Sequence, residues 1–232
     1  MYASRQEAAA KAPRGIPFGY SQATIVDHPN PAQLTSTRIV GAFNKKDYPV
    51  LVWLAKAFEN SSHLFDLGGN VGLEYYAYRR FVRYPPDLRW LVCELPELCQ
   101  VGRELASKRG AKDLAFTEEL AEAEGCDILL SCGTLQYLPK SLAAILESLT
   151  HKPRHVIIQR TPLCEGPTYY TMQNIGYAIC PYLIQNRLEF MESLKALGYH
   201  EVDYWKDSRE CHIPFHPSHT VRGYSGAYFT LR

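Results

Sequence analysis

The chain has 232 residues, 46% apolar and 21% charged, a balance typical of a globular domain with a full hydrophobic core. Its 25 basic and 24 acidic residues give a formal net charge of +1, which argues against a general nucleic-acid binder. The apolar runs are too short for membrane insertion. An N-terminus without an apolar stretch, and seven scattered cysteines without a CxxC pair, favour a cytoplasmic protein.

The first 43 residues show no sustained hydrophobic period, so we expect an irregular N-terminal arm over 1–43 and a single domain over 44–232. In that domain, short apolar runs alternate with helical patterns. Helices are predicted over 48–59, 72–83, 96–109, 139–150 and 187–197, and strands over 63–67, 90–94, 114–117, 127–131 and 155–159. Two final strand-like runs, 199–206 and 226–231, have no helix between them. This order predicts an α/β fold with a doubly wound, mainly parallel, seven-stranded sheet that ends in an antiparallel β-hairpin.

A glycine-rich turn joins the first predicted strand to the helix that follows it. Its sequence is FDLGGNVG, residues 65–72. Glycines let the backbone turn sharply and approach a ligand closely, and the N–H groups at a helix start can bind a polar ligand. Asp66, at the end of the strand, could orient the turn or accept a hydrogen bond from a cationic ligand. A glycine turn alone is as compatible with a structural role as with a binding site.

An acid follows the second predicted strand, where the sequence WLVCE ends in Glu94. An acid at this strand tip can bind both ribose hydroxyls of an adenosine ligand. The dinucleotide fingerprint G-x-G-x-x-G, anchored at Gly68, also requires glycines at positions where this chain has Asn70 and Leu73. An adenosine ligand without a pyrophosphate is therefore favoured over a dinucleotide.

These motifs together resemble the class I S-adenosylmethionine-dependent methyltransferases, whose fold is Rossmann-like. DLGGNVG is similar to their first motif, with Asn70 in place of the middle glycine, and DILLSCGTLQYLP, 127–139, is similar to their fourth. CELPEL, 93–98, is similar to a D-L-P stretch of the plant-type small-molecule O-methyltransferases. The resemblance implies that the glycines hold the methionine end of S-adenosyl-L-methionine, that Glu94 binds its ribose and that Glu118 lies near its adenine. The implied cofactor site consists of Asp66, Gly68, Gly69, Asn70, Gly72, Glu94, Leu95, Glu118, Ser131, Cys132 and Gly133.

The chain also resembles a family of small uncharacterised bacterial methyltransferases that are often associated with surface-polysaccharide gene clusters. Shared features are an RTP after the fifth strand at 160–162, Gln173, and a closing GYSGAYF at 223–229. This resemblance implies a sugar or another small polar acceptor. The long, tyrosine-rich connection 160–182 is expected to bind that acceptor through Arg160, Tyr169, Tyr170 and Gln173, although its tyrosines could equally pack against the sheet.

The source of a catalytic base is less evident. The chain has Gln136 where the plant-type enzymes have a histidine, and the adjacent Tyr137 is one candidate. The segment CHIPFHPSHT, 211–220, contains three histidines, which can take a proton near neutral pH. Of these, His216 is the preferred base, with His212 and His219 as alternatives. Two prolines and no helix in this segment argue against a fixed metal site, and no metal is predicted.

The sequence thus predicts an S-adenosylmethionine-dependent methyltransferase that acts on a small polar acceptor, with a hydroxyl as the expected nucleophile. Two alternatives stay open. A methyltransferase-like subunit could bind the donor without catalysis, and a nicotinamide-dependent oxidoreductase could use a similar sheet. No nucleic-acid or membrane partner is expected. The chain could form a homodimer, and residues 1–43 could cover the active site or a neighbouring subunit.

Overall fold

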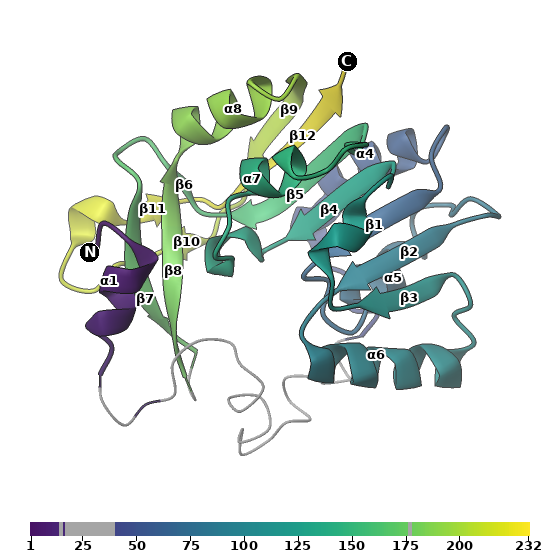
Figure 1. The fold of residues 1–232 in the computed structure, drawn as a ribbon, viewed down its shortest axis with the longest axis horizontal. Helices are drawn as coiled ribbons and strands as arrows, with labels where there is room; N and C mark the ends of the chain where they lie inside the picture. Colours follow the sequence, from purple (N-terminus) through teal and green to yellow (C-terminus); the bar gives the residue numbers. More distant parts are fainter. Residues whose placement is uncertain (14–15, 17–39, 176–177) are drawn as a thin grey trace.

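The computed structural model describes residues 1–13, 16, 40–175 and 178–232, and its main feature is a seven-stranded sheet (Figure 1). The strand order is β3-β2-β1-β4-β5-β12-β9. The strands are β1 (His63–Leu67), β2 (Arg89–Cys93), β3 (Leu114–Thr117), β4 (Ile128–Cys132), β5 (His155–Thr161), β9 (Tyr199–Lys206) and β12 (Ser225–Leu231). β1 to β5 pair in parallel, whereas β12 pairs antiparallel with both β5 and β9. The predicted Rossmann-like sheet with a C-terminal antiparallel pair is confirmed.

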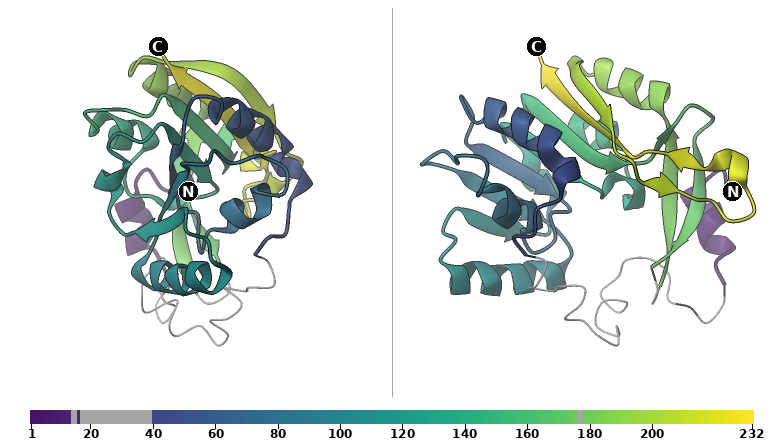
Figure 2. Two further views of the ribbon diagram at one scale, coloured as in Figure 1. Left: turned by 90° about the vertical axis from the view of Figure 1, so that its right-hand side faces the viewer. Right: turned by 180° about the vertical axis from the view of Figure 1, so that it is seen from behind.

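Helices pack on both faces of this sheet, and two further views show the layers (Figure 2). The first hydrophobic core includes side chains from α4 (Tyr48–Ala57), α5 (Leu73–Tyr78) and α6 (Pro96–Arg109). The second includes side chains from α7 (Leu142–Glu147) and α8 (Arg187–Lys195). Successive residues of β4 point to opposite faces, so that Ile128 and Leu130 enter the first core and Leu129 the second. None of the helices in the described ranges has the length and apolar content needed to cross a membrane.

Several helices are shorter than predicted, and α5 and α7 differ most. α5 ends at Tyr78 rather than at the predicted position 83. α7 begins at Leu142 rather than at 139, because the Ser141 side chain accepts a hydrogen bond from the Ala144 N–H at 3.2 Å and so caps the helix. Three-residue and four-residue 3-10 helices lie at η1 (Lys45–Asp47), η2 (Leu120–Ala123), η3 (Leu135–Tyr137) and η4 (Pro217–His219).

A second, small sheet occupies the segment that we expected to be a long connection, which corrects that prediction. It consists of β6 (Leu163–Cys164), β7 (Tyr169–Asn174) and β8 (Ile179–Asn186) in the order β6-β8-β7. A short hairpin of β10 (Glu210–Cys211) and β11 (Val221–Arg222) packs on it, and the two share a small apolar core. Tyr182 and Ile184, two positions apart in β8, are both buried in that core, and Ile213 and Val221 of the hairpin segment complete it.

The N-terminal arm is not wholly irregular, contrary to expectation. Helix α1 (Arg5–Ala10) starts at Ser4, whose side chain accepts a hydrogen bond from the Glu7 N–H at 3.1 Å. α1 contacts β7 and β8, and the backbones of Tyr2 and Tyr170 exchange two hydrogen bonds of 2.8 Å. Residues 14–15 and 17–39 of the predicted arm lie outside the described residues. The described start of the arm is therefore attached to the small sheet.

Candidate functional site

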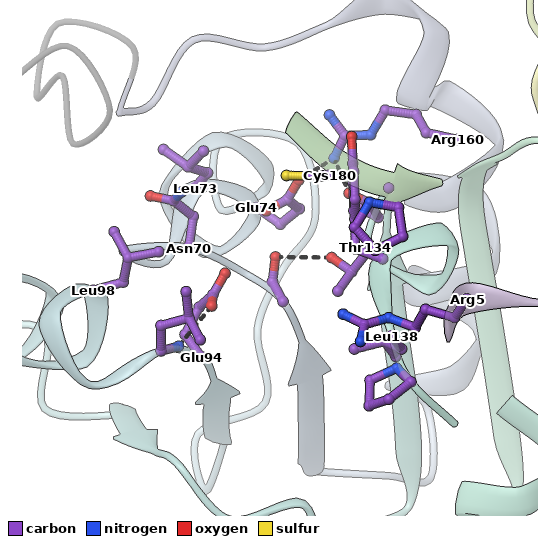
Figure 3. A pocket seen from close by; sticks show the side chains of 17 residues that line it. Arg5, Asn70, Leu73, Glu74, Glu94, Leu98, Thr134, Leu138, Arg160 and Cys180 are labelled. Carbon is purple, nitrogen blue, oxygen red and sulfur yellow. Dashed lines mark hydrogen bonds and ion pairs between the residues drawn. The ribbon is translucent and has the colours of Figure 1, made fainter. Parts of the chain in front are cut away.

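A cavity of about 390 Å³, here called the main cavity, opens beside the carboxyl ends of β1, β2 and β4. This edge is where ligands bind in doubly wound sheets. It is lined by residues that the sequence singled out: Gly68, Asn70, Glu94, Leu95, Cys132, Gly133, Tyr137 and Arg160. It is completed by residues that the sequence analysis did not assign to the site: Arg5, Leu73, Glu74, Leu98, Thr134, Leu138, Pro139, Cys180 and Pro181. Figure 3 shows Glu94 and Leu98 on one side of this space and Arg5 and Leu138 on the other.

The glycine turn requires left-handed backbone at three alternate positions. Gly68 has φ of 77° and Gly72 has φ of 86°, and a Cβ atom on Gly68 would overlap the Thr134 side chain. Asn70 lies between them with φ of 55°. Asparagine is one of the few residues other than glycine that enter this region readily. The replacement of the middle glycine by Asn70 therefore preserves the turn.

Asp66 lies beneath the turn and is fully buried. Its Oδ2 accepts a hydrogen bond from Trp90 Nε1 at 3.0 Å, whereas Oδ1 is buried without a partner among the described residues. Burial raises the pKa of this carboxyl well above its ordinary value, and the negative charge of Glu74 adds to the rise. Asp66 thus supports the turn from beneath, although it does not line the cavity.

Glu94 stands at the tip of β2 and faces the main cavity. Its Oε2 accepts a hydrogen bond of 2.7 Å from the Leu95 N–H, the first residue after it. Burial raises the pKa of Glu94 to about 7. The other carboxylate oxygen of Glu94 has no hydrogen-bond partner among the described residues, so the carboxylate is suited to accept hydrogen bonds from a vicinal diol.

A buried ion pair crosses the upper part of the cavity (Figure 3). Arg160 Nη2 donates to Glu74 Oε1 at 2.5 Å and to the Cys132 carbonyl at 2.8 Å. Arg160 has φ of 59° and lies opposite the register shift between β5 and β12, so a bulge turns its side chain out of the ladder. Burial raises the pKa of Glu74, and the positive charge of Arg160 offsets part of that rise. The ion pair is therefore fixed in place at the carboxyl ends of β4 and β5.

A smaller space of about 210 Å³, here called the side cavity, shares Cys132, Gly133, Tyr137 and Arg160 with the main cavity. Its other lining residues come from the second half of the chain: Gln136, Gln173, Tyr182, Arg209 and Tyr224. Tyr137 donates a hydrogen bond of 2.5 Å to Gln173 Oε1. Burial raises the pKa of Tyr137 to about 12, so this phenol stays protonated at neutral pH.

Other residues that the sequence analysis proposed lie elsewhere. Ser131 is fully buried and donates to the Leu67 carbonyl at 3.1 Å, and Glu118 is exposed outside the cavity lining. Gly69 and Gly72 shape the turn without lining the cavity. Tyr169 is buried in the small-sheet core, and Tyr170 pairs with Tyr2. These positions therefore lie outside the lining of both cavities.

The three histidines are not brought to either cavity. His212 and His216 are exposed, and His212 Nε2 lies 3.2 Å from a Glu210 carboxylate oxygen. His219 lines a separate hollow beside the β10–β11 hairpin, and its ring stands edge-on to Tyr169 with centroids 5.5 Å apart. The hairpin packs on the outer part of the small sheet rather than over the strand tips. Within the described ranges, no group of three or more His, Cys, Asp or Glu side chains is placed to hold a metal ion.

The residues that sequence reasoning missed carry weak local signals. Glu74 is an acid in the first turn after the glycine motif, a position where it also complements the helix dipole, so nothing marks it as part of a site. Arg5 belongs to a six-residue helix in a segment without hydrophobic period. Tyr224 lies within the closing GYSGAYF stretch but was not assigned to the site, and the pairing of β12 with β5, which places Ser225 opposite Thr161, brings it near Arg160. Arg209 lies outside the motifs and is held near Tyr224 by the backbone hydrogen bond from the Gly223 N–H to its carbonyl.

No protein-family model matches the chain, and none of the curated proteins matches its sequence. Solved structures do match its fold. The N-terminal domain of EvdMO1, in the presence of S-adenosylhomocysteine and D-fucose, is 14% identical with a TM-score of 0.53 over 82% of this chain and 84% of that one. The Burkholderia thailandensis 1,6-didemethyltoxoflavin-N1-methyltransferase, with S-adenosylhomocysteine bound, is 18% identical with a TM-score of 0.54 over 95% and 92%.

A third similar structure is the [4+2]-cyclase SpnF, 13% identical with a TM-score of 0.51 over 79% of this chain and 80% of that one. At these identities the similarities concern the fold, and a shared fold can carry different chemistries. The chain therefore has the Rossmann-like α/β fold that is found in S-adenosylmethionine-dependent methyltransferases.

Proposed function

We propose that the chain binds S-adenosyl-L-methionine in the main cavity and transfers its methyl group to a small polar acceptor. The observation that carries this proposal is the set of carboxyls around the glycine turn. Asp66, Glu74 and Glu94 all have raised pKa values because burial disfavours their charged forms. A ligand with positive charge at its sulfonium and ammonium groups would stabilise these carboxylates. The cavity therefore suits a cationic adenosine ligand.

The residues of the glycine turn disfavour the nicotinamide alternative. The side chains of Asn70 and Leu73 line the cavity at the two positions where the dinucleotide fingerprint requires glycine. We therefore favour the sulfonium donor over a dinucleotide.

Several residues of the main cavity have a proposed role toward the donor. The backbone from Gly68 to Gly72 would cradle the methionine end, and Cys132 and Gly133 would border it from the tip of β4. Glu94 would accept hydrogen bonds from the ribose hydroxyls, while Leu95 and Leu98 offer an apolar wall to the adenine. Glu118 is left out of this assignment because it is exposed and lies outside the lining.

The chemistry is a displacement at carbon. When bound, the donor supplies a methyl group to which the acceptor oxygen bonds while the carbon–sulfur bond breaks and its electron pair neutralises the sulfur. The acceptor's hydroxyl proton is released to water. Tyr137 stays protonated, so its proposed part is to orient the acceptor through its phenolic oxygen rather than to remove the proton. The D-fucose present with EvdMO1 makes a sugar hydroxyl a reasonable acceptor, and the toxoflavin enzyme makes a ring nitrogen the alternative.

A calorimetric titration with S-adenosylhomocysteine, run beside NAD, tests the proposal. We expect micromolar binding of S-adenosylhomocysteine and no binding of NAD. Glu94→Ala should weaken binding about 100-fold, because two charge-assisted hydrogen bonds are lost, and Glu94→Gln should have an intermediate effect. Glu104→Ala, which removes an exposed acid on α6, is the matched control and should change nothing.

Four outcomes would count against the proposal or a part of it. Equal binding in Glu94→Ala would remove the ribose assignment, and binding of NAD alone would favour the oxidoreductase. Absence of binding to both ligands would mean that the glycine turn is structural. Binding of S-adenosylhomocysteine without turnover across a broad acceptor panel would instead favour the catalytically silent subunit.

A further inference from the structure

The side cavity directly adjoins the main cavity. The two share Cys132, Gly133, Tyr137 and Arg160, which lie at the tips of β4 and β5 and in η3. Its volume of about 210 Å³ is below the roughly 300–1,000 Å³ of sites for drug-sized ligands. The space therefore admits one ring-sized group, and a larger acceptor would have to extend out of it.

The polar groups of this cavity are held in place before any ligand enters. Arg209 forms an ion pair with the buried Asp207, and its guanidinium lies 5.5 Å from the centre of the Tyr224 ring. The Tyr224 and Tyr182 hydroxyls are 2.9 Å apart, and Tyr182 packs edge-on against Tyr137. A wall whose members are already fixed loses little conformational entropy on binding. These contacts link the small sheet, η3 and the β9–β10 loop into one recognition surface.

Two buried polar atoms of this surface have no hydrogen-bond partner among the described residues. They are Gln136 Oε1, on a residue that is 6% exposed, and Arg160 Nε. One is an acceptor and the other a donor, and leaving such groups unmatched is costly. A hydroxyl group both donates and accepts, so a ligand with hydroxyls could satisfy both atoms.

The charges of the side cavity are already balanced. Glu74 neutralises Arg160, and Asp207 neutralises Arg209. No Asp or Glu is among the described residues that line this space. The cavity thus offers hydrogen-bond donors without a surplus of positive charge, and it offers no carboxylate to a cation. Neither a strong anion nor an amine is required to balance it.

We propose that the side cavity is the acceptor subsite and that it takes an uncharged, hydroxyl-bearing ring, with Gln136, Gln173 and Arg209 as specificity-determining residues. This inference rests on the proposed methyl transfer and specifies its acceptor. In this assignment the small sheet takes part in acceptor binding, since Gln173 on β7 and Tyr182 on β8 line the side cavity together with residues at the ends of β4 and β5.

Saturation-transfer NMR with the chain saturated with S-adenosylhomocysteine tests this inference. The probes are D-fucose, D-glucuronate and D-glucosamine, which are respectively uncharged, anionic and cationic. We expect the strongest transfer to D-fucose, and a loss of at least fivefold in Gln173→Leu and in Gln136→Leu. Both variants should bind S-adenosylhomocysteine within twofold of the wild type. Gln100→Leu, at an exposed position on α6, is the control and should behave as the wild type.

The outcomes separate this inference from the proposed function. Stronger transfer to either charged sugar, D-fucose transfer that survives in Gln173→Leu, or no transfer to any of the three would overturn the uncharged-ring assignment while donor binding stays intact. Failure of S-adenosylhomocysteine to bind would instead overturn the proposed function. Because Gln136 is buried, its variant counts only if its thermal unfolding matches the wild type, and the partly exposed Gln173 provides the independent test.

Discussion

The two halves of the site are built in opposite ways. Most of the main cavity is formed by short stretches that follow β1, β2 and β4, and burial raises the pKa of Glu94 in its lining and of Asp66 beneath it. The side cavity is assembled from segments that are up to about 90 positions apart, and its arginines are paired with buried carboxylates. The Glu94 carboxyl has no ion-pair partner among the described residues and can be matched by a ligand, whereas the paired charges of the side cavity leave selection to shape and hydrogen bonds.

Arg160 belongs to both halves, and its replacement should have the largest effect. Arg160→Ala leaves the buried Glu74 carboxyl without its partner, so we expect a loss of about 3 kcal/mol in the free energy of unfolding, measured by urea denaturation. The double variant Glu74→Leu with Arg160→Met should recover most of that loss. A single variant that loses less than about 1 kcal/mol would show that Glu74 finds other compensation.

Gly68 tests how tightly the main cavity is constrained. Gly68→Ala should cost about 2 kcal/mol and abolish S-adenosylhomocysteine binding, because the new Cβ meets Thr134 at a left-handed backbone position. Gly110→Ala is the matched control: its φ of 64° is also left-handed, but no atom lies within 4 Å of the added Cβ. We expect Gly110→Ala to lower the free energy of unfolding by about 1 kcal/mol and to leave S-adenosylhomocysteine binding unchanged. If the two variants had equal effects on stability and equal effects on binding, the glycine turn would have room to adjust.

Glu94 should make the ligand-free protein less stable as the pH rises. With its pKa raised to about 7 in the folded chain and near 4.5 when unfolded, the folded state binds the extra proton between these values, so its stability falls as pH increases through that window. At pH 8 the free energy of unfolding of Glu94→Gln should therefore exceed that of the wild type by on the order of 1–2 kcal/mol, which corresponds to a rise in Tm of about 2–8 °C. Near pH 4.5 the two proteins should be equally stable. Thermal unfolding across this range measures the difference, and a pH-independent difference would refute the assignment.

The binding of the donor should respond to pH in the opposite sense. Because the ribose hydroxyls need the charged carboxylate, S-adenosylhomocysteine should bind more weakly as the pH falls below about 7 in the wild type. Calorimetry at several pH values with Glu94→Gln as reference measures this trend. An identical pH profile in both proteins would assign the proton to another group.

The histidines should have the smallest effect. A triple variant, His212→Ala with His216→Ala and His219→Ala, should bind S-adenosylhomocysteine within twofold of the wild type and unfold within about 0.5 kcal/mol of it, since two of the side chains are exposed. The hydrogen bond from Tyr169 reaches the His219 carbonyl and survives the change. A collapse of turnover with unchanged affinity would return these residues to the catalytic site.

Much of the main cavity could be predicted from the sequence because its signals are local. The glycine turn and Glu94 each follow directly on an apolar strand, and parallel strands bring their carboxyl ends to one edge of the sheet. The antiparallel pair of β9 and β12 was likewise evident from the missing helix between two strand-like runs. Each of these features depends on the few residues on either side of it in the sequence. The order of the strands along the chain then determines where the features meet in the sheet.

The tertiary structure decided the rest. Whether the segment after β5 is a loop or a sheet depends on what packs against it, and Ile213 and Val221 of the distant hairpin segment supply that core. The same packing holds the three histidines away from the strand tips and brings Arg209 to the side cavity. The local sequence pattern predicts the strands, the glycine turn and Glu94, whereas burial and charge pairing arise between residues far apart in the chain. For that reason the sequence by itself indicated most of the proposed donor site, together with Arg160 and Gln173 near the proposed acceptor, whereas only the folded chain brings Gln136, Tyr182, Arg209 and Tyr224 together with them.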